Sequence, residues 1–142
     1  MLELYDLNRL DEKTVPRELR GYLSAHKKFM RETGFIPLHI EKKVQSAKIG
    51  VRGRLDRAGL MKGRRAIADL KTGTITEAVA LQMALYGHLL DPETWWERIA
   101  IQLKSDGSYS MKYFPLLSWP GDLATALSVV RISHWKLANG HY

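Results

Sequence analysis

The sequence predicts an α+β fold in which helices and strands follow one another in the order α-β-β-β-α-β-β-α. Two kinds of segment lead to this prediction: stretches in which apolar residues recur every three or four positions, as on one side of a helix, and shorter strand-like runs. We expect a central mixed sheet of about five strands flanked by helices. A length of 142 residues fits one domain, residues 1–142, with a single substantial core.

The first long helix is predicted to start near Thr14, as a capping residue, with Pro16 in the first turn. Behind this start, one inward-facing stripe consists of Leu19, Tyr22, Leu23, His26, Phe29 and Met30. Gly34 is expected to end the helix. The preceding residues 2–11 are either the end of another helix or an ordered arm.

Three strand-like runs come next, at residues 38–45, 49–58 and 64–71. Residues 77–90 are helical and apolar on more than one side, which predicts a helix buried against the sheet. Asp91 and Pro92 break that helix. Residues 95–103 and 109–114 form a predicted hairpin around Ser105-Asp106-Gly107, and a last helix runs from about Pro120 to Ala138.

The composition narrows the possible functions. The formal net charge of +7 suits a polyanionic partner, although a solvated basic surface explains it as well. The absence of cysteine excludes disulfides and thiolate metal sites. No apolar run is long enough to span a membrane and no secretory leader is recognisable, so we expect a cytoplasmic protein without a membrane partner.

Two acids and a lysine on neighbouring predicted strands form the candidate catalytic group. Side chains alternate along a strand, so Asp69 and Lys71 share one face and Leu70 points to the other. A two-residue turn at Lys62-Gly63 would place Asp56 directly opposite Asp69, and Arg54 opposite Lys71. Two opposed carboxylates repel each other unless a proton or a cation lies between them, and Mg²⁺ suits such a pair. Lys71 could then assist an attacking water. Alternatively, these residues form ordinary exposed ion pairs.

Three short motifs in this order resemble a known nuclease family. The motifs are Gly53-x-x-Asp56-Arg57, then Asp69-x-Lys71-Thr72-Gly73, then Gln82-x-x-x-Tyr86. They are similar to the RecB-like and Cas4-like branch of the PD-(D/E)xK nucleases, with small phage exonucleases among the nearest relatives. The resemblance spans roughly residues 19–90 and implies a restriction-endonuclease-like core.

The resemblance also implies roles for individual residues. Asp56 and Asp69 would hold Mg²⁺ or Mn²⁺, with the backbone carbonyl of Leu70 as a further ligand, and Lys71 would be catalytic. Gln82 and Tyr86 lie four residues apart, hence on one helix face, and would orient the substrate or the catalytic groups. The alternative for Tyr86 is a core position.

Glu41 matches a glutamate that such nucleases often carry on the preceding strand. It would bind the metal directly or through water, or merely pair with Arg54. Arg52, Arg54 and Arg57 are expected to contact DNA phosphates at a basic rim beside the site. His26 is expected to be structural, because it lies on the apolar stripe of its helix and its surroundings do not match the Gly-x-x-x-His pattern of the relatives. That pattern is expected to fall before residue 1.

These observations predict a metal-dependent deoxyribonuclease, an exonuclease rather than an endonuclease, that acts in phage or bacterial DNA recombination and repair. A single-strand annealing protein is a possible partner, and the oligomeric state is left open. The alternative is a catalytically impaired nuclease-fold module that binds DNA or a protein. A third possibility is a small interaction protein whose acids form ordinary ion pairs.

Overall fold

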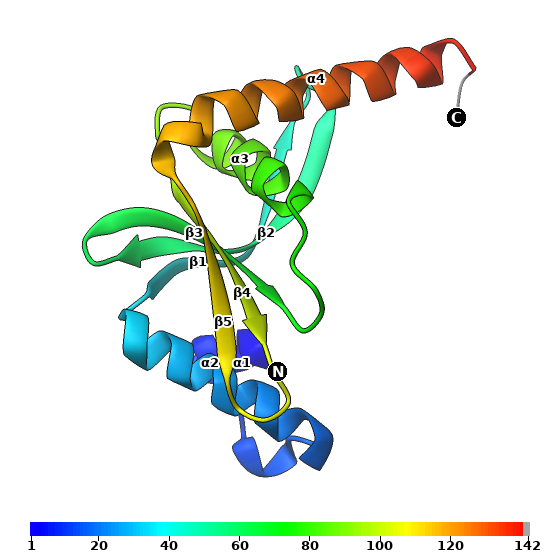
Figure 1. Cartoon of the computed structure of the whole chain (residues 1–142). Coiled ribbons are helices and arrows are strands. Elements are labelled where there is room, and N and C mark those ends of the chain that lie inside the picture. The colour runs from blue at the N-terminus through cyan, green and yellow to red at the C-terminus, as the bar shows by residue number, and fades with distance from the viewer. Residues whose placement is uncertain (141–142) are drawn as a thin grey trace.

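The computed structural model describes residues 1–140 and has the predicted α+β architecture (Figure 1). The strands are β1 (Ile36–Ser46), β2 (Val51–Met61), β3 (Arg64–Lys71), β4 (Glu97–Leu103) and β5 (Tyr109–Phe114). The helices are α1 (Leu2–Asp6), α2 (Arg20–Thr33), α3 (Ala78–Leu90) and α4 (Trp119–Ala138). Residues 141 and 142 of the predicted domain lie outside the described part.

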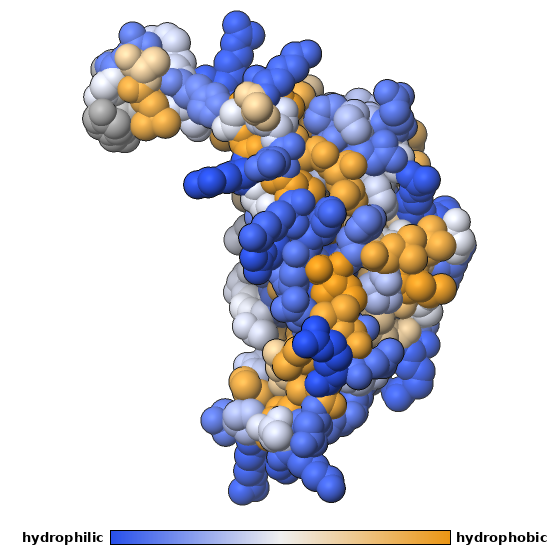
Figure 2. Space-filling model, turned by 180° about the vertical axis from the view of Figure 1, so that it is seen from behind, coloured by the Kyte–Doolittle hydropathy of each residue, from blue (hydrophilic) through white to orange (hydrophobic). Residues whose placement is uncertain are grey.

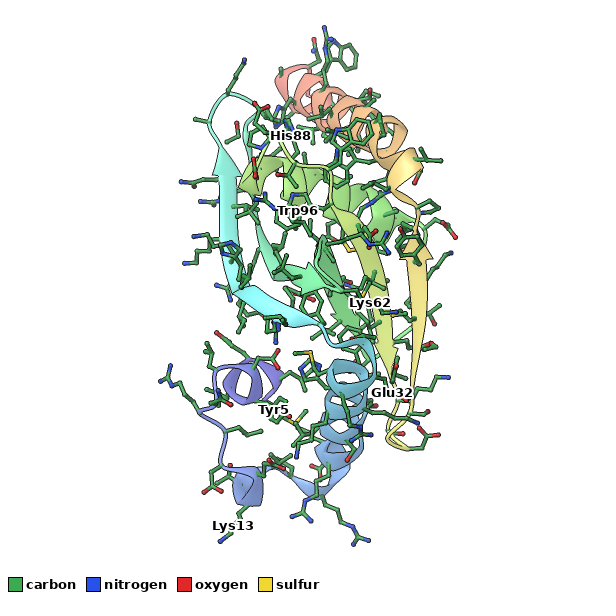
Figure 3. The ribbon with its side chains drawn as sticks, turned by 90° about the vertical axis from the view of Figure 1, so that its left-hand side faces the viewer. Tyr5, Lys13, Glu32, Lys62, His88 and Trp96 are labelled. Carbon is green, nitrogen blue, oxygen red and sulfur yellow. The ribbon has the colours of Figure 1, made fainter. Side chains whose placement is uncertain are left out.

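The five strands form one mixed sheet in the order β1-β2-β3-β4-β5. All neighbours are antiparallel except β3 and β4, which are parallel and are therefore joined by a crossover that contains α3. The predicted turn between β2 and β3 is confirmed: Lys62 and Gly63 both have positive φ, 52° and 77°, as a tight hairpin turn requires. Figure 3 looks onto the tip of this hairpin, where Lys62 is labelled.

The start of the first long helix differs from the prediction. Thr14 does not cap it; its hydroxyl donates a hydrogen bond to the carbonyl of Asp11, within a 3₁₀ turn. Val15 is extended (φ −71°, ψ 123°), as is usual for a residue before proline, so the chain cannot continue as a helix there. Helix α2 begins only at Arg20, and Gly34 ends it as predicted, with a φ of 66°.

The sheet separates two apolar clusters, one on each face. Along β3, Ile67 belongs to the cluster under α3 and α4, whereas its neighbours Ala66 and Ala68 belong to the cluster beside α2. This is the alternation of a strand that is covered on both sides. Helices α1 and α2 lie at one end of the molecule and α3 and α4 at the other (Figure 1).

Helix α3 is sandwiched between the sheet and α4, which confirms the prediction of a buried helix. It packs tightly at Gly87, where an added Cβ would lie 2.6 Å from Ile67 and 2.8 Å from Trp119. The far end of α4 leaves the body of the protein: residues 131–140 are all exposed, and the end projects at the upper left of Figure 2. The sheet and α3 are packed directly on each other and form the part of the molecule on which a site can be built.

Candidate active site

The candidate site lies where the β2–β3 ladder opens. The predicted register is confirmed as far as the last pair, Arg57 and Ala68. The next pair would be Asp56 and Asp69, but there the strands are no longer paired. Instead, Oδ2 of Asp56 accepts a hydrogen bond of 3.0 Å from the main-chain N–H of Leu70. The carboxylate of Asp56 thus replaces a missing strand contact, which fixes it beside β3.

Asp69 is largely enclosed, with only 13% of its side chain exposed. Its Oδ2 atom lies 3.2 Å from Nζ of Lys71 in an ion pair, but no donor is aligned to give this oxygen a hydrogen bond. Burial, and then the neighbouring charge of Asp56, raise the pKa of Asp69 to about 6, although the charge of Lys71 acts in the opposite direction. An enclosed carboxylate with an unused lone pair beside a second acid is suited to a cation.

Helix α3 closes the opening between the strands. Gln82 and Tyr86 from α3 and Asp56, Asp69 and Lys71 from the strands line one small pocket of about 90 Å³. The remaining lining residues are Arg54, Leu55, Ile67, Ala68 and Met83. The structure therefore brings the three sequence motifs together in one place.

Gly53 explains how Tyr86 reaches this pocket. A Cβ at Gly53 would lie 2.3 Å from Cζ of the Tyr86 ring and 2.4 Å from its hydroxyl oxygen, so only glycine leaves room for the phenol. The glycine of the first motif and the tyrosine of the third are thus the two sides of one contact.

Glu41 stands beside the pocket, not among the residues that line it. It lies across from Asp56, between the paired residues Ile40–Arg57 and Lys42–Leu55 of the β1–β2 ladder. Its φ of 51° is unusual for a residue other than glycine and is the kind of strain that collects at functional sites. Its Oε1 atom accepts a hydrogen bond of 3.3 Å from Arg57, not from Arg54.

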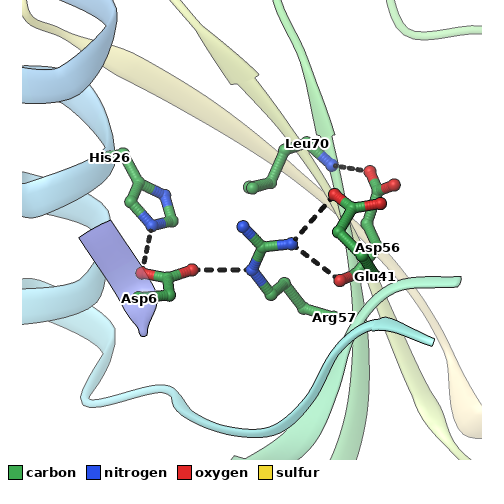
Figure 4. A network of polar contacts seen from close by, with 6 residues as sticks. All are labelled: Asp6, His26, Glu41, Asp56, Arg57 and Leu70. Atoms are coloured by element: carbon green, nitrogen blue, oxygen red, sulfur yellow. Dashed lines mark hydrogen bonds and ion pairs between the residues drawn. The ribbon is translucent and has the colours of Figure 1, made fainter. Parts of the chain in front are cut away.

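The prediction that Arg57 belongs to an exposed basic rim is wrong. Its side chain is only 3% exposed and forms ion pairs with Asp6 and Glu41, so a DNA phosphate cannot reach it (Figure 4). His26, buried as predicted, binds the other oxygen of Asp6 at 2.7 Å. A buried charge is stable only with such partners, and the strand alternation gave no sign of them because Asp6 lies 51 residues away in the chain.

The other two arginines of the predicted rim are exposed. Arg54 lines the pocket of the two acids and also a second, open hollow of about 540 Å³ on the β1–β2 ribbon, which Arg52 and Lys43 share. Lys43 pairs with Arg54 across the two strands. Within residues 1–140, neither Lys43, Arg52 nor Arg54 forms an ion pair. Their charges are therefore available to an anion.

The acids offer an open metal site and not a closed cage. Among the described residues, no three His, Cys, Asp or Glu side chains are grouped for a metal ion. Mg²⁺, however, is typically held by one or two carboxylates, and water and substrate phosphate complete its shell. Asp56 and the unsatisfied oxygen of Asp69 fit that pattern. When bound, a divalent ion polarises a phosphate and lowers the pKa of a bound water.

Comparison with protein families agrees with this geometry. Residues 5–115 match the PD-(D/E)XK nuclease superfamily. The chain belongs to this superfamily. The matched range contains the whole sheet and α3, and the mixed five-stranded sheet flanked by helices is consistent with a restriction-endonuclease-like core. Membership indicates a metal-dependent nuclease with DNA as its substrate.

No curated protein matches the chain. No helix in the described part is long and apolar enough to cross a membrane.

Proposed function

We propose that this PD-(D/E)XK nuclease is a DNA exonuclease of the RecB-like branch that requires Mg²⁺ or Mn²⁺. The observation that carries the proposal is the single pocket shared by Asp56, Asp69, Lys71, Gln82 and Tyr86. The three motifs that the sequence shares with that branch all contribute to this pocket, although they come from two strands and a helix.

The chain supplies four groups for phosphodiester hydrolysis. Asp56 and Asp69 would hold the divalent ion, and the carbonyl of Leu70 is well placed to join them. Its N–H points to Asp56, and the N–H and C=O of one strand residue point to the same neighbouring strand. Lys71, 41% exposed and paired with Asp69, can hold or deprotonate a water or steady the negative charge that develops on the phosphate.

The residues on α3 are proposed to orient the substrate. Gln82 is exposed and offers an amide, and Tyr86 is half-buried against Gly53. Arg52 and Arg54 would hold the phosphates next to the one that is cut, without reading the sequence. In a bacterial or phage setting such an enzyme would resect DNA ends in the cytoplasm for recombination or repair, with a single-strand annealing protein as the expected partner.

Digestion of two matched DNA substrates tests this proposal. End-labelled linear DNA and closed circular DNA of the same sequence are incubated with the chain and Mn²⁺ or Mg²⁺, beside Asp69→Asn and Lys71→Ala. We expect stepwise loss of the linear substrate only, and at least a hundred-fold slower digestion by either variant. Digestion of the circular substrate at the same rate would make the protein an endonuclease. Digestion that survives both substitutions would reject the site.

DNA binding without cleavage is the second candidate function. It is favoured by the position of His26, whose Nε2 binds Asp6 and not the acids of the pocket. Among the described residues, no histidine lines that pocket. Retention of DNA without cleavage, unchanged in Asp69→Asn, would support this function.

A further inference from the structure

Arg57 connects Asp56, which lines the pocket, with Glu41, which lies beside it. Its Nη1 atom donates one hydrogen bond to the main-chain oxygen of Asp56, at 2.7 Å, and another to Oε1 of Glu41, at 3.3 Å. One guanidinium group thus holds the backbone of β2 at Asp56 and the side chain that stands across from it on β1 (Figure 4). The planar guanidinium fixes the directions of both bonds, which a lysine ammonium could not do.

Asp6 holds Arg57 from the opposite side. Its Oδ2 accepts a hydrogen bond of 2.6 Å from Nε of Arg57, and its carboxylate is only 1% exposed. Burial alone would raise the pKa of Asp6, but hydrogen bonds and charges from His26 and Arg57 outweigh burial and keep the pKa below its ordinary value. Asp6 is therefore an ionised anchor with two partners.

His26 fixes Asp6 in turn. The ring is fully buried in α2 between Tyr5 and Phe29, with centroids 5.8 and 6.3 Å away. Since Asp6 is ionised, Nε2 of His26 donates to it, and Nδ1 has no hydrogen-bond partner within the described part of the chain. The hydrogen-bond network His26–Asp6–Arg57 thus connects the α1–α2 end of the molecule with Asp56 and Glu41. Asp6 and Arg57 are 51 residues apart in the sequence.

Glu41 shows why this connection matters for the site. Its left-handed backbone, with a φ of 51°, costs energy and persists only where the surroundings hold it in place. No other hydrogen bond or ion pair of the Glu41 side chain is found among residues 1–140. Arg57 is therefore the contact that sets the direction of Glu41, and through the carbonyl of Asp56 it also supports the strand that carries the first proposed metal ligand.

We propose that Arg57, held by Asp6 and His26, is a positioning residue that sets the geometry of Asp56 and Glu41 for the divalent ion. The inference rests on the proposed metal-dependent function and assigns a role to three residues that touch neither ion nor substrate. Groups that orient metal ligands from behind typically contribute ten- to hundred-fold to metal affinity or activity.

The competing explanation is that this network is only a buried ion pair that stabilises the fold. The chain offers a matched control for that role. Arg98 is equally buried and binds Asp122, Ser118 and two main-chain carbonyls, but it lies on β4 and does not line the pocket. If Arg57 only stabilises the fold, substitutions of Arg57 and of Arg98 should therefore change Mn²⁺ affinity equally.

The test compares Arg57→Lys, Asp6→Asn and Arg98→Lys with the original chain. Calorimetric titration with Mn²⁺, at a temperature where all four are folded, measures metal affinity, and DNA cleavage gives kcat and KM. We expect Mn²⁺ affinity and kcat to fall ten- to hundred-fold in Arg57→Lys and less in Asp6→Asn, while KM for DNA stays within two-fold. Arg98→Lys should lower the melting temperature but keep Mn²⁺ affinity within two-fold.

The other outcomes distinguish failure of the positioning role from failure of the proposed nuclease function. Equal losses of Mn²⁺ affinity in Arg57→Lys and Arg98→Lys, or unchanged affinity and kcat in Arg57→Lys, would overturn the positioning role and leave the nuclease proposal intact. No Mn²⁺ binding and no cleavage by the original chain would overturn both. If Arg57→Lys does not fold, Asp6→Asn and His26→Gln, which leave the guanidinium in place, decide by the same comparison.

Discussion

At the scale of single residues, the site places two carboxylates, Asp56 and Asp69, close enough to repel each other. Asp69 lies beside Asp56 in a mostly enclosed position, and its Oδ2 accepts no hydrogen bond. Lys71 relieves only part of the conflict, since the pKa of Asp69 is still raised to about 6. In the metal-free chain this arrangement costs stability, and the divalent ion of the proposed function would remove that cost.

Asp69→Asn is therefore expected to stabilise the metal-free chain near pH 7.5. The amide removes the charge of the buried group and keeps its shape, so the repulsion from Asp56 ends. Thermal unfolding in the presence of a chelator should show a higher melting temperature for the variant, and the stabilisation that Mn²⁺ gives the original chain should disappear. A lower melting temperature without metal would mean that the Asp69–Lys71 ion pair outweighs the conflict.

The raised pKa of Asp69 also predicts how stability changes with pH. The folded metal-free chain binds a proton at Asp69 with a pKa of about 6, against an ordinary value of 3.8. Between these values the folded state binds more protons than the unfolded state, so this contribution to stability grows as the pH falls through 6 towards 4 and is lost as the pH rises through 6. Denaturant unfolding of the original chain and of Asp69→Asn, at pH 5 and at pH 7, isolates the contribution of Asp69. The difference in unfolding free energy between the two proteins should be smaller at pH 5 than at pH 7.

At the scale of elements, the site depends on how closely α3 approaches β2. Tyr86 can lie over the strand only because Gly53 has no side chain, and the same helix brings Gln82 to the lining of the pocket. The contact explains a glycine in the middle of a strand, where it otherwise weakens the sheet.

Gly53→Ala should therefore damage the site more than the fold. The new methyl group would overlap the Tyr86 ring, and an overpacked contact of this kind costs about 1–3 kcal/mol. We expect a moderate loss of unfolding free energy and a much larger relative loss of nuclease activity, because the ring must leave the pocket. Gly121→Ala in α4 is the control, since open space surrounds that position; it should leave activity unchanged and be neutral or slightly stabilising.

The sequence predicted the parts of the fold that depend on local rules. The Lys62-Gly63 turn, the register from Leu60 to Arg57 and the end of α2 at Gly34 follow from turn chemistry and strand alternation. The wrong prediction for Arg57 arose from a contact between residues that are distant in the sequence. Its burial depends on Asp6, which the fold brings to the sheet from another element, and alternation along one strand carries no information about such a partner. The N-cap of α2 is Leu19, five residues after the predicted cap Thr14, because a Thr and a Pro in this pattern also suit a 3₁₀ turn.

At the scale of the whole molecule, charge is arranged in a line along the β1–β2 ribbon. Arg52, Arg54 and Asp56 are alternate residues of β2, so they follow one another at steps of roughly 7 Å. Lys43 stands opposite Arg54, and like charges in that position are unfavourable unless an anion lies between them. A basic track thus leads to the acids of the pocket, in a chain whose net charge is +7. This favours a DNA strand that runs along the ribbon.

The salt dependence of DNA binding tests that path. Removal of one phosphate contact lowers the slope of log affinity against log salt concentration by about 0.9 for duplex DNA and about 0.7 for a single strand. For Arg52→Gln combined with Arg54→Gln we therefore expect a reduction of about 1.4–1.8, measured with Ca²⁺ in place of Mn²⁺ to limit cleavage. Lys13→Gln combined with Arg17→Gln removes the same charge from exposed positions that precede α2. Lys13 is labelled at the bottom of Figure 3, away from the β1–β2 ribbon. An equal reduction of the salt slope in both double variants would show that net charge alone attracts the DNA. If the DNA follows the ribbon, only the Arg52 and Arg54 substitutions remove phosphate contacts, so the two reductions differ.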